Sequence, residues 1–158
     1  MIATASTLLD CSPARVWQEV QTSKLLVYIT RPLLVLQPIT PARFPDIWTD
    51  GKYLTRMKLF GLIPFGKHWI VITHPMPDPT PGKQVYKILD DGYGDFISTW
   101  RHLITIRETE DRRTHYTDRI EIRAGVLTPV IWLYASLFYR YRQMRWRRLI
   151  AHGFDYRQ

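Results

Sequence analysis

Two stretches of the chain, residues 100–107 and 114–123, alternate with a period of two. Such alternation predicts two β-strands, each with one face in solvent and the other face covered. The charged side chains of both stretches belong in solvent. The covered face then carries Trp100, His102, Ile104 and Ile106 on the first strand and Tyr116, Asp118, Ile120 and Ile122 on the second.

The imidazole and the carboxylate on this covered face need partners, because a buried polar group without one costs about 1–3 kcal/mol. If Glu108 lies opposite Arg112 across a turn at residues 109–111, His102 lies directly opposite Asp118. A carboxylate bonded to an imidazole orients the ring and favours its charged form, as a general base requires. His102 and Asp118 are therefore the candidate catalytic pair. The alternative is a structural hydrogen bond within the core.

The composition is that of a globular protein. A chain of 158 residues with 46% hydrophobic and 23% charged residues predicts a single domain over residues 1–158. The single cysteine, Cys11, excludes an internal disulfide and suits a reducing compartment. The first ten residues contain neither a basic segment nor a long apolar run. We therefore expect no signal peptide and a cytoplasmic location.

The formal net charge of +8 raises the question of a nucleic-acid or anionic-lipid partner. Much of this charge lies near one end of the chain, at Arg140, Arg142, Arg145, Arg147 and Arg148. No recognised nucleic-acid motif accompanies these arginines. We interpret them as a solvated helix face and predict no nucleic-acid partner.

Start and stop signals predict the remaining elements. A first strand at residues 3–9 leads to a helix with Ser12 as N-cap and Pro13 in its first turn. A second short helix begins at Ser23 and ends near Arg31-Pro32. A proline-containing connection follows, and strands are expected at residues 52–60, 67–74 and 83–90, with a loop at 61–66 and turns at 75–82 and 91–94.

A helix of about 22 residues, with Thr128 as N-cap, is predicted after the hairpin. The face that we expect to cover the sheet carries Val130, Leu133, Tyr134, Leu137, Tyr141 and Met144. An aromatic stripe on the opposite side carries Trp132, Tyr139 and Trp146, beside Ile150. Three alternatives account for this stripe: cover by other parts of the chain, a homodimer contact, or contact with a membrane surface.

The order of these elements resembles the helix-grip fold of the START-related (SRPBCC) superfamily, which includes polyketide cyclase/dehydrase, lipid-transfer and pollen-allergen-type proteins. Four segments carry the resemblance: SPARVW at residues 12–17, LFGLIPFGKH at 59–68, WRH at 100–102 and TDR at 117–119. It implies an α+β fold in which a curved antiparallel sheet wraps around a long C-terminal helix, with two short helices after the first strand.

The resemblance also implies a ligand pocket between the sheet and the helix. Its strand residues would be Tyr53, Met57, Leu59, His68, Ile70, Ile72, Tyr86, Ile88, Trp100, His102, Tyr116 and Asp118. Its helical wall would be Leu133, Leu137, Tyr141 and Met144. An apolar pocket with a few convergent polar groups is typical of small-ligand sites.

Three functions remain open on the sequence. The first is binding of a hydrophobic small molecule, such as a lipid, a polyketide-like compound or an aromatic compound. The second is a cyclase/dehydrase- or hydrolase-type enzyme that uses His102 and Asp118. The third is a peripheral membrane or oligomeric interaction protein that uses the terminal helix.

We expect neither a metal nor a cofactor. His68 and His74 lie about 20 Å apart on an extended strand and cannot bind one ion. No cofactor motif is present in the sequence.

Overall fold

The computed structural model describes residues 1–76 and 85–157, and its strands form one antiparallel sheet. The strand order is β1-β7-β6-β5-β4-β3-β2. The strands are β1 (Ile2–Leu9), β2 (Leu34–Thr40), β3 (Gly51–Leu59), β4 (Ile63–Thr73), β5 (Val85–Gly94), β6 (Thr99–Glu108) and β7 (Thr114–Arg123). The helices are α1 (Pro13–Val20), α2 (Ser23–Thr30), a short 3-10 helix η1 (Gly125–Leu127) and α3 (Thr128–Ala151).

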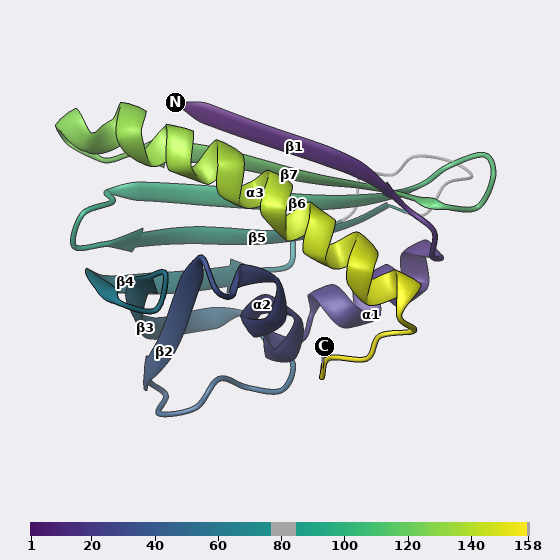
Figure 1. The fold of residues 1–158 in the computed structure, drawn as a ribbon, viewed down its shortest axis with the longest axis horizontal. Helices are drawn as coiled ribbons and strands as arrows, with labels where there is room; N and C mark the ends of the chain where they lie inside the picture. Colours follow the sequence, from purple (N-terminus) through teal and green to yellow (C-terminus); the bar gives the residue numbers. More distant parts are fainter. Residues whose placement is uncertain (77–84, 158) are drawn as a thin grey trace.

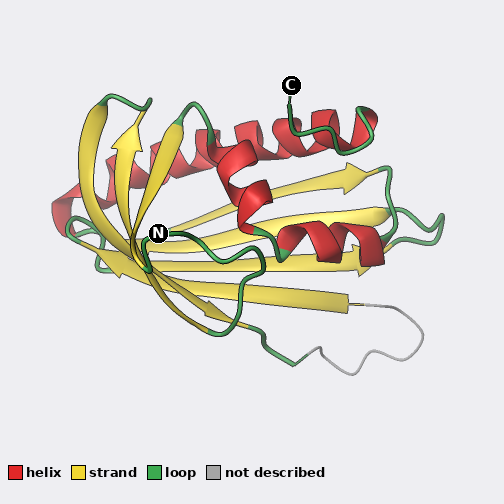
Figure 2. Cartoon of the chain, turned by 90° about the horizontal axis from the view of Figure 1, so that it is seen from below, coloured by secondary structure: helices red, strands yellow, loops and turns green. Residues whose placement is uncertain are grey.

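The long helix α3 crosses one face of this sheet, with α1 and α2 beside its C-terminal half (Figure 1). The sheet is curved toward the side on which the helices lie (Figure 2). This is the predicted helix-grip arrangement. The N-cap of α1 is also as predicted, because the Ser12 hydroxyl accepts a hydrogen bond from the Arg15 amide at 3.4 Å.

Two segments that were predicted as a connection and a turn are strands in the structure. The reason is that proline and glycine are compatible with a strand at these two positions. The proline-containing connection includes β2, an edge strand on which Pro38 needs no amide donor. The predicted turn at residues 91–94 continues β5. A Cβ at Gly92 would lie 2.7 Å from His68 Nε2, and one at Gly94 would lie 2.3 Å from the Lys67 carbonyl oxygen. Only glycine allows β5 to approach β4 this closely.

Other boundaries also shift. The predicted loop at residues 61–66 is shorter, because β4 already begins at Ile63. Of the predicted turn at 75–82, only residues 75 and 76 lie within the described part of the chain.

The predicted register of the β6–β7 hairpin is wrong by two residues. Glu108 lies opposite Thr114, so His102 lies opposite Ile120, and Asp118 lies opposite Ile104. The cause is a longer turn, in which the Thr109 amide donates to the Arg113 carbonyl at 2.9 Å. A shift of two residues preserves the face of every side chain, because strands have a period of two. His102 and Asp118 therefore both remain on the covered face, as diagonal neighbours.

The predicted orientation of α3 is wrong for four of the six residues that were expected to face the sheet. Leu133, Leu137 and Met144 are exposed (56%, 59% and 48%), and Tyr141 donates through its hydroxyl to the Arg31 carbonyl at 2.8 Å. The four residues therefore form no wall toward the sheet. The helix instead buries Ile131, Ala135, Phe138, Tyr139, Arg142, Gln143, Trp146 and Leu149. The error has a physical reason: α3 carries apolar residues on both sides, so periodicity alone does not decide which side faces the core.

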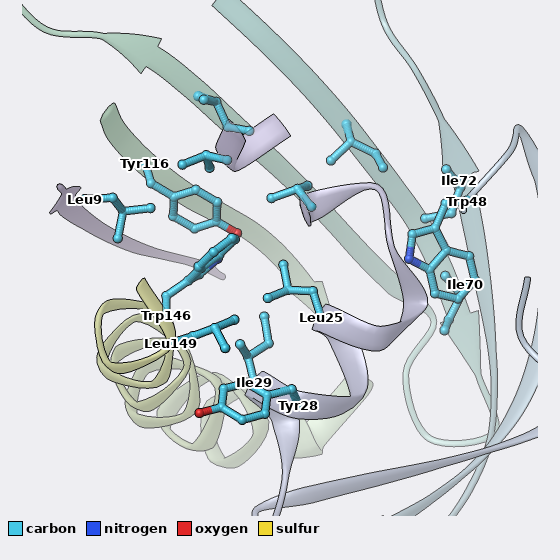
Figure 3. Close-up of a cluster of buried hydrophobic side chains, with 14 of the residues drawn as sticks. Leu9, Leu25, Tyr28, Ile29, Trp48, Ile70, Ile72, Tyr116, Trp146 and Leu149 are labelled. Carbon is cyan, nitrogen blue, oxygen red and sulfur yellow. The ribbon is translucent and has the colours of Figure 1, made fainter. Parts of the chain in front are cut away.

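The aromatic stripe of α3 is covered by other parts of the chain. Tyr139 and Trp146 are 1% and 0% exposed, and the Trp132 indole nitrogen donates to the Ile2 carbonyl at 2.8 Å. Figure 3 shows the Trp146 ring beside Tyr116 and Leu149, within the larger core cluster. The homodimer or membrane contact that we considered is therefore wrong for Tyr139 and Trp146, whereas Trp132 is half-buried.

Candidate functional site

A cavity of about 200 Å³ lies between α3 and the sheet. Its walls come from α2, β2, β3, β4, β5, β6 and α3 and are mostly apolar. The lining residues are Leu26, Thr30, Leu34, Leu36, Met57, Leu59, Phe65, His68, Ile70, Asp90, Ile97, Trp100, His102, Val130, Ile131, Tyr134, Phe138, Tyr139 and Arg142. Four of these side chains can carry charge: His68, Asp90, His102 and Arg142.

The cavity extends along α3 from Val130 to Arg142, a rise of about 18 Å at 1.5 Å per residue. Val130 is 68% exposed, whereas Arg142 is 4% exposed. The apolar end therefore lies toward solvent, and the polar end lies in the interior.

A second cavity of about 60 Å³ continues beyond this polar end. The two cavities share Leu26, Ile70, Asp90, His102 and Arg142. The polar group of Asp90, His102 and Arg142 thus lies between two apolar spaces, where a ligand in either space would meet it.

The predicted pocket residues divide into three groups: residues that line one of the two cavities, residues that lie nearby, and residues on the far side of α3. The larger cavity is lined by Met57, Leu59, His68, Ile70, Trp100 and His102, and the smaller one by Ile70, Ile72, Ile88, His102 and Tyr116. Tyr53, Tyr86 and Asp118 lie nearby but outside both linings: Tyr53 is core, Tyr86 stacks on Trp17, and Asp118 lies behind His102. The third group is Leu133, Leu137, Tyr141 and Met144, on the far side of α3.

His102 and Asp118 form a buried hydrogen bond of 2.8 Å between Nε2 and Oδ1. The Asp118 side chain accepts two further bonds, from the Tyr116 hydroxyl to Oδ1 and from Gln143 Nε2 to Oδ2, each at 3.2 Å. Asp118 is 0% exposed. Both carboxylate oxygens are thus engaged, and the carboxylate holds the His102 ring in place.

Electrostatics give this pair a defined protonation state. Burial raises the pKa of Asp118, but Arg142, His102 and Gln143 together outweigh burial and hold it below its ordinary value. Burial lowers the pKa of His102, and Asp118 offsets only part of this effect. The pair at neutral pH is therefore a carboxylate and a neutral imidazole. Because the carboxylate only accepts, His102 Nε2 carries the proton and Nδ1 carries the lone pair.

Asp90 is the second carboxylate of the site. Its Oδ1 accepts a hydrogen bond from the Val71 amide at 2.8 Å, where the β4–β5 pairing is interrupted. Burial raises the pKa of Asp90 to about 7. The charge of this side chain near neutral pH is therefore variable.

His68 lines the cavity and has one buried polar atom without a partner in the described part of the chain. The residue is 5% exposed, and its buried Nδ1 has no hydrogen-bond partner among the described residues. Burial lowers the pKa of His68 to about 4, so the ring is neutral at physiological pH. Trp100 packs edge-on against this ring, with centroids 6.3 Å apart.

Arg142 and Asp90 are functional candidates that the sequence did not indicate. Arg142 resembled its solvated neighbours on α3, and Asp90 preceded an expected turn. One signal was available for Arg142. Large aromatic side chains are seldom exposed in a row, and Arg142 lies between Tyr139 and Trp146 on their side of the helix.

Three solved structures match nearly the whole chain. A protein of Chromobacterium violaceum matches with a TM-score of 0.63 and 14% identity, over 94% of this chain and 96% of its own. A protein of Thermus thermophilus has a TM-score of 0.62 and 10% identity, over 98% and 100%. A START superfamily protein of Mycobacterium smegmatis has a TM-score of 0.62 and 10% identity, over 96% and 97%.

These matches confirm the START-like, helix-grip fold that the element order predicted. At these identities the likeness establishes the fold alone. No protein-family model matches the chain, and no curated protein is significantly similar to it in sequence.

Two further findings concern the described residues. Neither α3 nor any shorter helix among them has the length and apolarity needed to cross a membrane. No three His, Cys, Asp or Glu side chains within residues 1–76 and 85–157 are grouped as metal ligands would be.

Proposed function

We propose that this protein binds a small hydrophobic molecule in the cavity between α3 and the sheet. The observation that carries this proposal is the apolar space of about 200 Å³ with polar groups at its inner end. An apolar cavity of about 150 Å³ is enough to bind benzene, whereas drug-sized ligands occupy about 300–1,000 Å³. We therefore expect a compact ligand, such as a short lipid, a small polyketide-like compound or an aromatic compound.

Filling the cavity with a protein side chain should weaken binding strongly. Leu36 is half-buried on β2 and lines the cavity, so the indole of a Leu36→Trp variant would occupy the ligand's space. We expect this variant to bind octan-1-ol at least about tenfold more weakly than the wild type, as measured by isothermal titration calorimetry.

The matched control is Leu133→Trp, because Leu133 is exposed on the far side of α3. This variant should bind octan-1-ol like the wild type. The proposal fails if the wild type shows no saturable binding, or if the two variants lose affinity equally. Circular dichroism should show that both variants remain folded.

A second candidate function, proton transfer, is favoured by the orientation of His102. With Nε2 bound to Asp118, the Nδ1 lone pair of His102 is free to act as a general base toward a ligand in the cavity. Such a base removes a proton from the carbon next to the carbonyl group of a bound ketone. The imidazolium that forms exchanges this proton with solvent and then returns a proton from the solvent to the same carbon.

This reaction is measurable as hydrogen exchange. In D₂O, the wild-type protein should accelerate deuterium incorporation next to the carbonyl of octan-2-one, followed by ¹H NMR. The His102→Gln variant should still bind the ketone but should show only the buffer-catalysed rate. Equal rates for the wild type and His102→Gln would exclude a general-base role for His102.

A further inference from the structure

Arg142 is a buried cation without a direct ionic partner. It is 4% exposed, and no carboxylate of the described residues lies within 4.0 Å of its guanidinium nitrogens. Its Nε is buried without a hydrogen-bond partner in the same part of the chain. One side of the guanidinium faces aromatic rings, with Cζ 4.7 Å from the Tyr139 centroid and 5.8 Å from the Phe138 centroid. Arginine does not lose its proton in proteins, so this charge persists.

The two acidic groups nearby do not complete the ion pair. Asp118 lines neither cavity, and its oxygens are engaged by His102, Tyr116 and Gln143. Asp90 lines both cavities, but its Oδ1 is bound to the Val71 amide, and burial favours its neutral form. Of the charged groups that line the cavity, Arg142 alone has a permanent charge, and its Nε is a donor without a partner among the described residues.

We infer that the ligand of this cavity carries one carboxylate, and that Arg142 binds it. The inference rests on the proposed function and adds the chemical class of the ligand: a compact amphiphile with an apolar body and a single anionic head. The head would lie at the inner end, between Asp90, His102 and Arg142. The apolar body would extend past Ile131 and Tyr134 toward Val130, where the cavity is lined by apolar side chains.

The inner location of Arg142 strengthens this interaction. Bonds between a guanidinium and a carboxylate are among the strongest hydrogen bonds in proteins, and a low dielectric strengthens them further. His68 lines the same cavity, and its buried Nδ1 has no hydrogen-bond partner among the described residues.

Three probes with the same eight-carbon chain separate the effect of the head group from that of the tail. Octanoate, octan-1-ol and octylammonium are titrated by calorimetry into the wild type, Arg142→Met and Arg140→Met. Methionine retains the length of the side chain and removes the charge. Arg140 is an exposed arginine two residues away on α3 and serves as the matched control. The wild type should bind octanoate about tenfold more tightly than octan-1-ol and should bind octylammonium least.

Arg142→Met should lose the preference for octanoate over octan-1-ol, whereas Arg140→Met should keep the preference of the wild type. If Arg142→Met does not fold, Arg142→Lys replaces it, and the preference for octanoate should fall while remaining above unity, because lysine keeps the charge without the bidentate geometry. A wild type that prefers octan-1-ol or octylammonium, or a preference for octanoate that survives Arg142→Met, would overturn the inference. Octan-1-ol binding would still stand in those cases, so the proposed function is tested separately; if no probe binds, both fail.

Discussion

Replacing Trp146 with alanine is expected to lower the free energy of unfolding by about 3–5 kcal/mol, the usual cost of truncating a buried aromatic residue. Trp146 is 0% exposed and packs against Tyr116, with ring centroids 6.0 Å apart. The loss would leave a large void where α3 meets α1, α2 and the sheet. Equilibrium urea unfolding measures this change directly.

Leu137→Ala is the matched control on the same helix. Leu137 belongs to the face that periodicity assigned to the core, yet it is 59% exposed. Its truncation should change the free energy of unfolding by less than about 0.5 kcal/mol. If Leu137→Ala destabilised the protein more than Trp146→Ala, the observed orientation of α3 would be incorrect.

The second large effect is expected from Asp118→Ala. This substitution removes the acceptor of three hydrogen bonds, from His102, Tyr116 and Gln143. It also removes a negative charge that favours the buried Arg142 cation. Removing one partner of a buried charged network costs about 3–5 kcal/mol, because the remaining groups stay desolvated.

Glu121→Ala is the control for this variant. Glu121 lies on the same strand as Asp118, but its side chain pairs with Arg123 on the solvent face at 3.0 Å. Exposed ion pairs contribute little, so this variant should unfold at nearly the same urea concentration as the wild type. Equal midpoints for the two variants would show that the Asp118 network does not hold the core together.

The fold was predictable because several independent signals in the sequence agree. Ser12 and Pro13 mark the start of α1, and the alternation of β6 and β7 assigns His102 and Asp118 to one covered face. The two-residue error in register had no consequence for the pair, because only an odd shift exchanges the faces of a strand. The turn length itself depends on hydrogen bonds of Thr109 that composition does not reveal.

The orientation of α3 was not predictable from its periodicity. Leu133 and Leu137 form an apolar stripe on one side of the helix, and Tyr139 and Trp146 form another on the opposite side. The choice between them depends on volume: the aromatic residues fill the space under the sheet and α2, and the leucines are left outside. A core containing Arg142 and Gln143 also contradicts the usual assignment of polar residues to solvent.

Only half of the polar end of the site was predictable from the sequence. His102 and Asp118 lie on regular strands, where alternation predicts burial. Asp90 lies where β4 and β5 part and its side chain takes the Val71 amide. That interruption is a property of the assembled sheet, and residues 91–94 of β5 read in the sequence as a turn.

The central claim, that a small molecule occupies the cavity between α3 and the sheet, is tested most directly by methyl NMR. Isoleucine methyl groups report three environments: Ile70, Ile97 and Ile131 on the cavity wall, Ile106 and Ile120 in the core, and Ile47 and Ile63 on the surface. Titration with octan-1-ol should shift the cavity methyl signals in a saturable manner, with one molecule bound per chain, and leave the other groups nearly unchanged. Shifts confined to the surface methyl groups, or no saturable shift, would contradict the account.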